Sequence, residues 1–289
     1  MDSDVKASSI VELNNEDPGK PTPRTVLGRR LQRLRTEGEL SQRGLAERVK
    51  YPHTYLSRVE RGEQLPSEGL AEALDAYFGT LGLFAELLEL AQHSTIPDYG
   101  QKIVENEEKA ARIQVFDSSV VPGLLQTEDY ARALIRISLP GVSADDIEER
   151  VAIRMRRRRI FEKQDKPLYW AIMDEAAIKR PVGGVGCMMG QVGHILKAVE
   201  ASHISVQVLP FTRGEHSLMG GCLYLLTLEN GATIGYAESF ASGELVEAPR
   251  RLLQLTQRFD EARSQALPKD ETLDLLHSYL KGYEDDDDS

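Results

Sequence analysis

Four polar side chains on one short predicted helix are suited to reading the bases of duplex DNA. An arginine can donate two hydrogen bonds to O6 and N7 of guanine, a threonine offers a hydroxyl and a methyl group, and a histidine can donate to a purine. Leu56 and Val59 take the opposite side of this helix, so the four face outward, and each contact would discriminate between bases by roughly 1–3 kcal/mol. The base-reading candidates are His53, Thr54, Ser57 and Arg58.

Three further side chains are candidates for contacts to phosphates, which position a protein on DNA without reading its sequence. They are Gln42, in the first turn of the preceding helix, Arg43 and Arg61. Residues 24–62 carry ten Lys and Arg against four Asp and Glu, whereas the whole chain has a net charge of −11. The rest of the chain therefore carries about −17, and positive charge is concentrated where phosphates would be met.

A set of short helices is required to position these side chains. Leu27, Leu31 and Leu34 form one apolar stripe, and Gly38 is predicted to end that helix. Ser41 is placed to cap the next helix. The five predicted helices begin near Leu27, after Ser41, at Pro52, at Ser67 and near Leu83.

The segment SQRGLAERVKYPHTYLSRVERG at 41–62 resembles the helix-turn-helix of the lambda-repressor and Cro-like, xenobiotic-response-element family of regulators. The resemblance implies that Gln42 and the early residues of the third helix touch DNA. It also implies a partly buried ion pair between Arg35 and Glu60 that sets the angle between helices. Losing one partner would strand a buried charge. Pro52 stands where the family usually has Ser or Thr, so a phosphate contact from that hydroxyl is absent.

Beyond about residue 94 the pattern indicates an α+β domain with a small, mainly antiparallel sheet. Asn230-Gly231 is a strong hairpin signal. Strands are predicted at Leu168–Met173, Ile204–Leu209, Cys222–Leu228 and Thr233–Ser239. Helices are predicted at about Glu105–Phe116, Glu128–Ser138, Ala144–Lys163, Cys187–Ala201, Val246–Gln265 and Glu271–Tyr279.

The two ends of the chain and its composition set further expectations. Residues 1–23 are predicted to be a disordered arm, and 282–289 a solvated acidic tail, since five consecutive carboxylates repel one another. The apolar runs are far shorter than the roughly 20 residues that cross a bilayer, and no signal pattern is found, so we expect a cytoplasmic protein. Cys187 and Cys222 suggest neither a disulfide nor a zinc site.

A carboxylate-histidine enzyme using Asp174-Glu175 and His216 is conceivable. No nucleophile elbow, Walker loop, GxGxxG or metal-ligand spacing supports it, so we expect no catalytic residue, metal or cofactor. Glycines at 183–186 precede a helix and could seat an anion, although a plain loop is favoured.

The run RMRRRR at 154–159 contains five arginines that cannot all point one way, since residues step by about 100° around a helix. A solvated or ion-paired face is favoured. Contact with an acidic protein partner and extra contact with DNA are the alternatives. The residues concerned are Arg154, Arg156, Arg157, Arg158 and Arg159.

Several segments resemble the large actinobacterial class of helix-turn-helix regulators typified by the sporulation regulator WhiJ. They are VPGLLQTEDYARALI at 121–135, MDEAAIKRPVGG at 173–184, MGQVGHIL at 189–196, ISVQVLPF at 204–211 and YAES at 236–239. Tyr99 and Arg159 depart from the class pattern. The resemblance implies a C-terminal domain that senses or binds something, often encoded beside a small acidic, antitoxin-like protein.

Together these features predict a sequence-specific DNA-binding transcriptional regulator. Residues 24–93 would form an all-α five-helix DNA-binding domain, and 94–281 an α+β regulatory or partner-binding domain. A homodimer is expected, because one helix-turn-helix reads only a few base pairs and two-fold pairing supplies half-sites about 34 Å apart. The alternative is an antitoxin-like module whose main role is to hold a small acidic partner.

Overall fold

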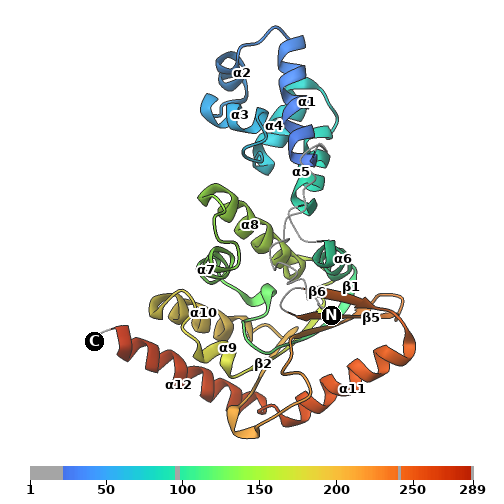
Figure 1. The fold of residues 1–289 in the computed structure, drawn as a ribbon, viewed down its shortest axis with the longest axis vertical. Coiled ribbons are helices and arrows are strands. Elements are labelled where there is room, and N and C mark those ends of the chain that lie inside the picture. The colour runs from blue at the N-terminus through green and yellow to red at the C-terminus, as the bar shows by residue number, and fades with distance from the viewer. Residues whose placement is uncertain (1–21, 95–97, 240–241, 288–289) are drawn as a thin grey trace, which may run out of the picture. The chain divides into compact units, whose positions relative to one another are not determined.

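A computed structural model describes residues 22–94, 98–239 and 242–287 of the chain. The chain forms two compact units, Met1–Thr95 and Ile96–Ser289. Figure 1 shows that the described part of the first unit is helical and that the second combines helices with a sheet.

The first unit contains the five predicted helices. They are α1 (Pro23–Glu37), α2 (Gln42–Val49), α3 (His53–Glu60), α4 (Glu68–Phe78) and α5 (Leu83–Ser94). Thr22 caps α1, because its hydroxyl accepts a hydrogen bond of 3.3 Å from the N–H of Thr25, and Pro23 opens the helix. These two residues were predicted to belong to the arm 1–23, whose remaining part lies outside the described residues.

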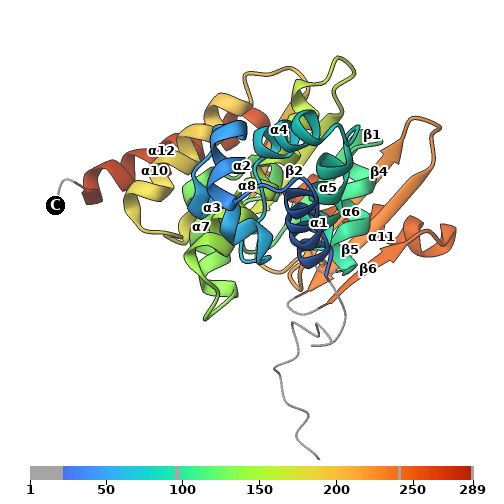
Figure 2. The same cartoon turned by 90° about the horizontal axis from the view of Figure 1, so that it is seen from above.

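All five helices contribute to one apolar core. The predicted stripe of α1 faces inward, and Leu27 and Leu31 are almost fully buried. The other helices add a buried leucine or phenylalanine each, namely Leu45, Leu56, Leu74 and Phe84. This core aligns α2 and α3, whose outer sides remain exposed, and Figure 2 shows both helices in a second view.

The second unit alternates helices and strands along the chain. Its helices are α6 (Asp98–Glu107), α7 (Glu128–Ser138), α8 (Ala144–Arg157), α9 (Ala176–Lys179), α10 (Val185–Ala198), α11 (Pro249–Gln265) and α12 (Lys269–Asp287). Three short 3-10 helices are η1 (Gly123–Leu125), η2 (Arg158–Glu162) and η3 (Phe211–Arg213). Its strands are β1 (Ala110–Asp117), β2 (Leu168–Asp174), β3 (Ile204–Leu209), β4 (Cys222–Leu228), β5 (Thr233–Ser239) and β6 (Ser242–Val246).

The strands form a six-stranded mixed sheet in the order β3-β2-β1-β4-β5-β6. The pairs β1–β2 and β2–β3 are parallel, and β1–β4, β4–β5 and β5–β6 are antiparallel. The antiparallel pairs are the majority, and the prediction of a helical domain followed by an α+β domain is confirmed.

Both faces of this sheet are covered. Phe259 and Ala262 of α11 pack on one face against Phe116 and Leu225. Side chains of α10 and α12 pack on the other face, against residues such as Val115. Figure 1 shows α9, α10 and α12 near one another, whereas α11 runs away from them on the other side of the domain.

Four details of the second unit differ from the prediction. The segment Glu105–Phe116 is not one helix: α6 ends at Glu107 and β1 follows, lying between β2 and β4 and buried on both faces from Ile113 onward. The helix predicted to reach Lys163 ends at Arg157 and continues as η2. The third difference is that strand β6 and the short helix α9 were not predicted.

The fourth difference lies in the acidic tail predicted at 282–289. Helix α12 continues through it to Asp287, because Tyr283 is buried and its hydroxyl donates to the carbonyl of Ile178 at 2.7 Å. The carboxylate residues Glu284, Asp285 and Asp286 of this helix are exposed.

Candidate nucleic-acid interface

Local contacts and backbone conformation set the start of α2, its end and the start of α3. The hydroxyl of Ser41 accepts a hydrogen bond of 3.0 Å from the N–H of Gly44 and starts α2. Helix α2 ends at Val49, and the next residue, Lys50, has a left-handed φ of 60° and ψ of 40°, a conformation that glycine usually adopts. Pro52 then precedes α3 without a side-chain cap, as its lack of a hydroxyl predicts.

Helices α1 and α3 approach each other at Gly28. A Cβ atom at this position would lie 2.5 Å from the carbonyl oxygen of Val59 and 2.7 Å from that of Glu60. Only glycine fits there without moving α3 away from α1. Gly28 therefore sets how closely the end of α3 is held to α1.

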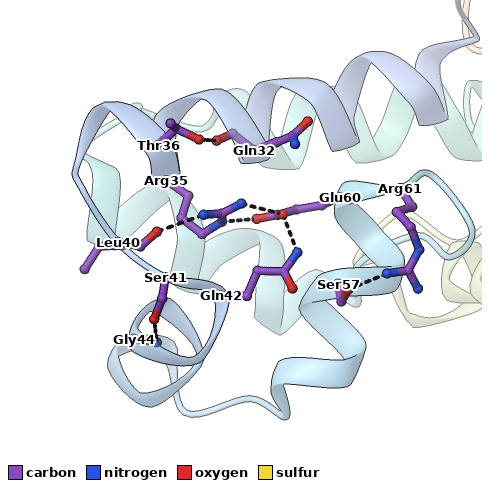
Figure 3. Close-up of polar contacts among 10 residues, drawn as sticks. All are labelled: Gln32, Arg35, Thr36, Leu40, Ser41, Gln42, Gly44, Ser57, Glu60 and Arg61. Atoms are coloured by element: carbon purple, nitrogen blue, oxygen red, sulfur yellow. Dashed lines mark hydrogen bonds and ion pairs between the residues drawn. The ribbon is translucent and has the colours of Figure 1, made fainter.

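The ion pair predicted between Arg35 and Glu60 is present in the structure (Figure 3). Nε of Arg35 lies 2.5 Å from Oε1 of Glu60, and Nη2 lies 2.9 Å from Oε2, so the pair is bidentate. The exposed fractions of the two side chains are 14% and 3%. The hydrogen bond to Glu60 raises the pKa of Arg35. Nη1 of Arg35 also donates to the carbonyl of Leu40 at 2.8 Å, which joins α1 to the turn before α2.

Gln42 completes this arrangement by donating from Nε2 to Oε2 of Glu60 at 2.8 Å (Figure 3). The sequence had suggested a phosphate contact for Gln42, and the bond to Glu60 was not foreseen. An amide nitrogen carries two hydrogens, so one donor of Gln42 is committed within the protein and one is left.

Ser57 and Arg61 are bonded to each other on the outer side of α3. Nη1 of Arg61 donates to the hydroxyl of Ser57, and its Nε and Nη2 lie 2.6 and 2.7 Å from the carboxylate of Glu63. The hydrogen bond to Glu63 raises the pKa of Arg61, and the same bond lowers the pKa of Glu63. Both side chains of the ion pair are about half exposed, so the contact is weak and can be exchanged.

The remaining candidates lie on the surface. His53, Thr54 and Arg58 of α3 are exposed, and so is Arg43 of α2, whereas Ser57 is half-buried. Tyr55, between them, accepts a hydrogen bond of 2.7 Å from the N–H of Ser67 and so ties α3 to the start of α4. His53, Thr54 and Arg58 therefore lie exposed on one helix, α3, and Tyr55 holds that helix to the start of α4.

A recess of about 440 Å³ adjoins this surface and adds residues that the sequence did not single out. Thr25, Arg29 and Gln32 of α1 line it together with Gln42, Ser57, Glu60 and Arg61. Arg29 and Gln32 are exposed. Their position could have been inferred from the apolar stripe of α1, because both residues lie off that stripe.

Profiles of known protein families match both units. A helix-turn-helix domain profile matches residues 26–87. A second profile, described as a domain of unknown function (DUF5753), matches residues 101–278, more than half of the chain. The chain belongs to the DUF5753 family. With its helix-turn-helix domain, this member of the DUF5753 family is a DNA-binding regulator. No curated protein and no solved structure matches the chain.

Within the DUF5753 domain, the arginine run is turned largely inward. Arg157 forms a bidentate pair with Glu107 at 3.0 and 2.8 Å, with exposed fractions of 17% and 1%. Arg154 donates to Oε1 of Gln126 at 3.0 Å, and Arg158 lies 3.1 Å from Nε2 of His194. Positions i, i+3 and i+4 of a helix share a face, and these three arginines therefore make their contacts within the domain. The alternative of a contact with an acidic partner stays a prediction.

Arg156 and Arg159, the other two arginines of the run, are half-buried and exposed respectively. Each has an interaction within the structure. A partner contact of the arginine run, predicted for residues 154 and 156–159, would therefore have to compete with contacts inside the domain.

The residues of the enzyme hypothesis hold a loop of the DUF5753 domain. Nε2 of His216 lies 3.2 Å from Oδ2 of Asp174, and the histidine is 3% exposed. Glu175 accepts hydrogen bonds from the hydroxyl of Tyr279 at 2.6 Å and from the N–H of Phe211 at 2.7 Å. These contacts fix the segment after β3 to the end of β2.

None of the helices in the described ranges is long and apolar enough to span a bilayer. Within those same ranges, histidine, cysteine and carboxylate side chains do not gather in a group of three that could hold a metal ion.

Proposed function

We propose that this protein is a sequence-specific transcriptional regulator in which α3 lies in the major groove. His53, Thr54, Ser57 and Arg58 would read base edges there. The DUF5753 domain would supply dimerisation and receive a signal or a protein partner. One observation carries the proposal: the outer side of α3 presents exposed hydrogen-bonding side chains, while its inner side is fixed by Leu56, Val59 and Glu60.

The anchoring of α3 supports base reading in particular. Base contacts discriminate only when donors are held in a fixed direction, and the Arg35–Glu60–Gln42 arrangement fixes α3 against both α1 and α2. Gln42 retains one amide hydrogen, which can donate to a phosphate while the other holds Glu60.

Phosphate contacts would come from the rim of the same surface. Arg43 is exposed beside the start of α2. Arg61 can exchange its exposed pair with Glu63 for a phosphate, and this exchange would release the hydroxyl of Ser57 for a base. Arg29 of the recess is a further candidate, since the structure gives it no ion pair with a described residue.

Two copies of the chain are expected to act together. A single helix-turn-helix reads too few base pairs for an operator, and a two-fold dimer presents its two α3 helices to half-sites about 34 Å apart. Operators would then be inverted repeats with one helical turn between half-site centres.

Selection from a random DNA library with purified protein tests this function directly. The expected result is an enriched inverted repeat bound with a Kd that rises steeply with salt. The selection is repeated with the product of the adjacent gene, which tests the acidic partner that the WhiJ resemblance implies.

Variants of the selected complex assign the base readers. Arg58→Ala should lose discrimination at one base pair of each half-site, by roughly 1–3 kcal/mol, and Thr54→Ala at a neighbouring one. Arg251→Ala, which removes an exposed arginine of the DUF5753 domain, is the matched control and should keep full discrimination. If Arg58→Ala and Thr54→Ala bind as the control does, α3 is not the recognition helix.

A further inference from the structure

A row of polar side chains lies on the face of the DUF5753 sheet that α10 and α12 cover. Register places Asp117 of β1 opposite Cys222 of β4, and Cys222 opposite Glu238 of β5. Residues directly opposite in antiparallel strands point to the same face. Val115, two residues before Asp117 on β1, points to the same face and packs in the core. The polar row therefore lies next to apolar residues of that face.

Arg154 of α8 meets this row with most of its hydrogen-bonding capacity unused. Among the described residues its guanidinium makes one hydrogen bond, to the amide oxygen of Gln126, although it carries five N–H donors. It interacts electrostatically with Tyr224, Glu238 and Glu107. Within the described ranges neither carboxylate forms a direct ion pair with it, and Glu107 is already paired with the neighbouring Arg157.

The charge of Arg154 is thus poorly compensated by the protein. Burial and the nearby charge of Arg157 lower the pKa of Arg154. Burial also raises the pKa of Glu238 and raises that of Asp117 to about 6, so these carboxylates are weak counter-ions. A cation in such surroundings is costly unless an anion joins it.

A second, independent feature of the same region is the hydroxyl group of Tyr169. The side chain is 2% exposed, and its hydroxyl has no hydrogen-bond partner in the described structure. It lies within electrostatic range of both Arg157 and Glu107. Arg154 has the same two residues as electrostatic neighbours. Buried hydroxyl groups are almost always paired, so an unpaired one near this group of charges indicates a missing acceptor.

We propose that Arg154 and Tyr169 form the core of a ligand site that binds a small organic oxyanion, a carboxylate or a phosphate. The oxyanion would accept hydrogen bonds from the unused N–H groups of Arg154 and from the hydroxyl of Tyr169. Binding of the oxyanion does not depend on the proposed function, whereas its effect on DNA binding does. The site would be where the DUF5753 domain receives its signal.

Thermal unfolding of the full chain tests the site with three probes: inorganic phosphate, acetate and benzoate. Ionic strength is held constant with chloride. At least one probe should raise the unfolding midpoint by about 2–4 °C when its concentration reaches about ten times Kd. A response to phosphate alone or to the carboxylates alone identifies the class of oxyanion.

Two variants and a matched control connect the response to these residues. Arg154→Met should abolish the shift and should itself leave the midpoint without added probe unchanged or higher, because it removes an uncompensated charge. Tyr169→Phe should weaken the response. Tyr283→Phe removes a hydroxyl that is bonded to the carbonyl of Ile178, so it should lower the midpoint and keep the full shift.

The outcomes separate the site from its role. If no probe shifts the midpoint of the unmodified protein, or if Arg154→Met responds as the unmodified protein does, the site is refuted. DNA affinity is then measured with and without the active probe. A probe that stabilises the protein without changing DNA affinity supports the site and overturns its role in signalling.

Discussion

The side-chain amide of Gln42 donates to Oε2 of Glu60 at 2.8 Å, and the same carboxylate pairs with Arg35. The first turn of α2, the last turn of α3 and the end of α1 therefore meet at one buried carboxylate. A helix-turn-helix binds DNA as a rigid unit, and this junction fixes the angle at which α3 is presented.

Removing this carboxylate should loosen the first unit. Glu60→Ala leaves Arg35 buried without its anion, and we expect the free energy of opening of α1–α3 to fall by about 3–5 kcal/mol. Hydrogen exchange of the amides in α1–α3 measures this loss. Glu37→Ala breaks the pair Arg33–Glu37, whose side chains are 70% and 58% exposed, and should change the exchange by less than about 0.5 kcal/mol. Equal effects of the two substitutions would contradict a structural role for Glu60.

Gly28→Ala should weaken DNA binding although Gly28 lies away from the predicted contacts. The added methyl group would overlap the carbonyl of Val59, push α3 from α1 and destabilise the unit by roughly 1–3 kcal/mol. Fluorescence anisotropy with the selected operator measures the affinity. Gly190→Ala is the control: its Cβ meets nothing within 4 Å in α10, so it should stabilise the protein by about 0.5–1 kcal/mol and leave DNA affinity unchanged. An unchanged affinity for Gly28→Ala would show that α3 tolerates displacement.

Arg43→Ala should act on salt dependence and leave sequence preference intact. A phosphate contact releases counter-ions on binding, so its loss should reduce the slope of the logarithm of the association constant against the logarithm of salt concentration by about 1. Titrations between 50 and 200 mM salt, which are roughly the useful range for such slopes, measure it. A slope equal to that of the unmodified protein would remove Arg43 from the phosphate contacts.

Asp117→Asn should remove a pH-dependent loss of stability from the DUF5753 domain. Burial raises the pKa of Asp117 to about 6, so the folded state binds a proton that the unfolded state releases near pH 4. The resulting stabilisation is present below about pH 4 and is lost as the pH rises through 6. Asparagine keeps the oxygen that accepts from the N–H groups of Ser119 and Val120, both at 3.0 Å.

Urea unfolding at a series of pH values, followed by the fluorescence of Trp170, the single tryptophan, checks this. Relative to the variant, the unmodified protein should lose about 2–3 kcal/mol between pH 4 and 7. Parallel stability curves for the two proteins would mean that Asp117 ionises as an exposed carboxyl group does.

The first unit was predictable because its signals are short-range. Ser41 caps α2 within three residues, and the leucine stripe of α1 repeats every turn. The contact between Gln42 and Glu60 spans 18 positions. The residue type of Gln42 does not show whether its amide bonds to another helix or to a phosphate. That role could be found only once the two helices were placed.

The second unit was harder to predict from the sequence, because its determining contacts join residues that are far apart in the chain. Strand β1 is buried on both faces from Ile113 onward, so it lacks the alternation of apolar and polar residues that marks a half-exposed strand. The partner of Arg157 is Glu107, 50 positions earlier, and the orphaned hydroxyl of Tyr169 is apparent only in the packed domain. Charge compensation depends on tertiary neighbours, which composition does not encode.

The hydrophobic clusters of the two units share no described residue: one cluster draws only on α1–α5 and the turns between them, and the other three draw on residues from Ile103 onward. Each half can therefore accept changes in its packing without repair in the other. In evolutionary terms, a recombination near residue 95 would exchange the helix-turn-helix domain while keeping the DUF5753 domain. Under the proposed function, such exchanges would give a lineage families of regulators that answer one stimulus at many promoters.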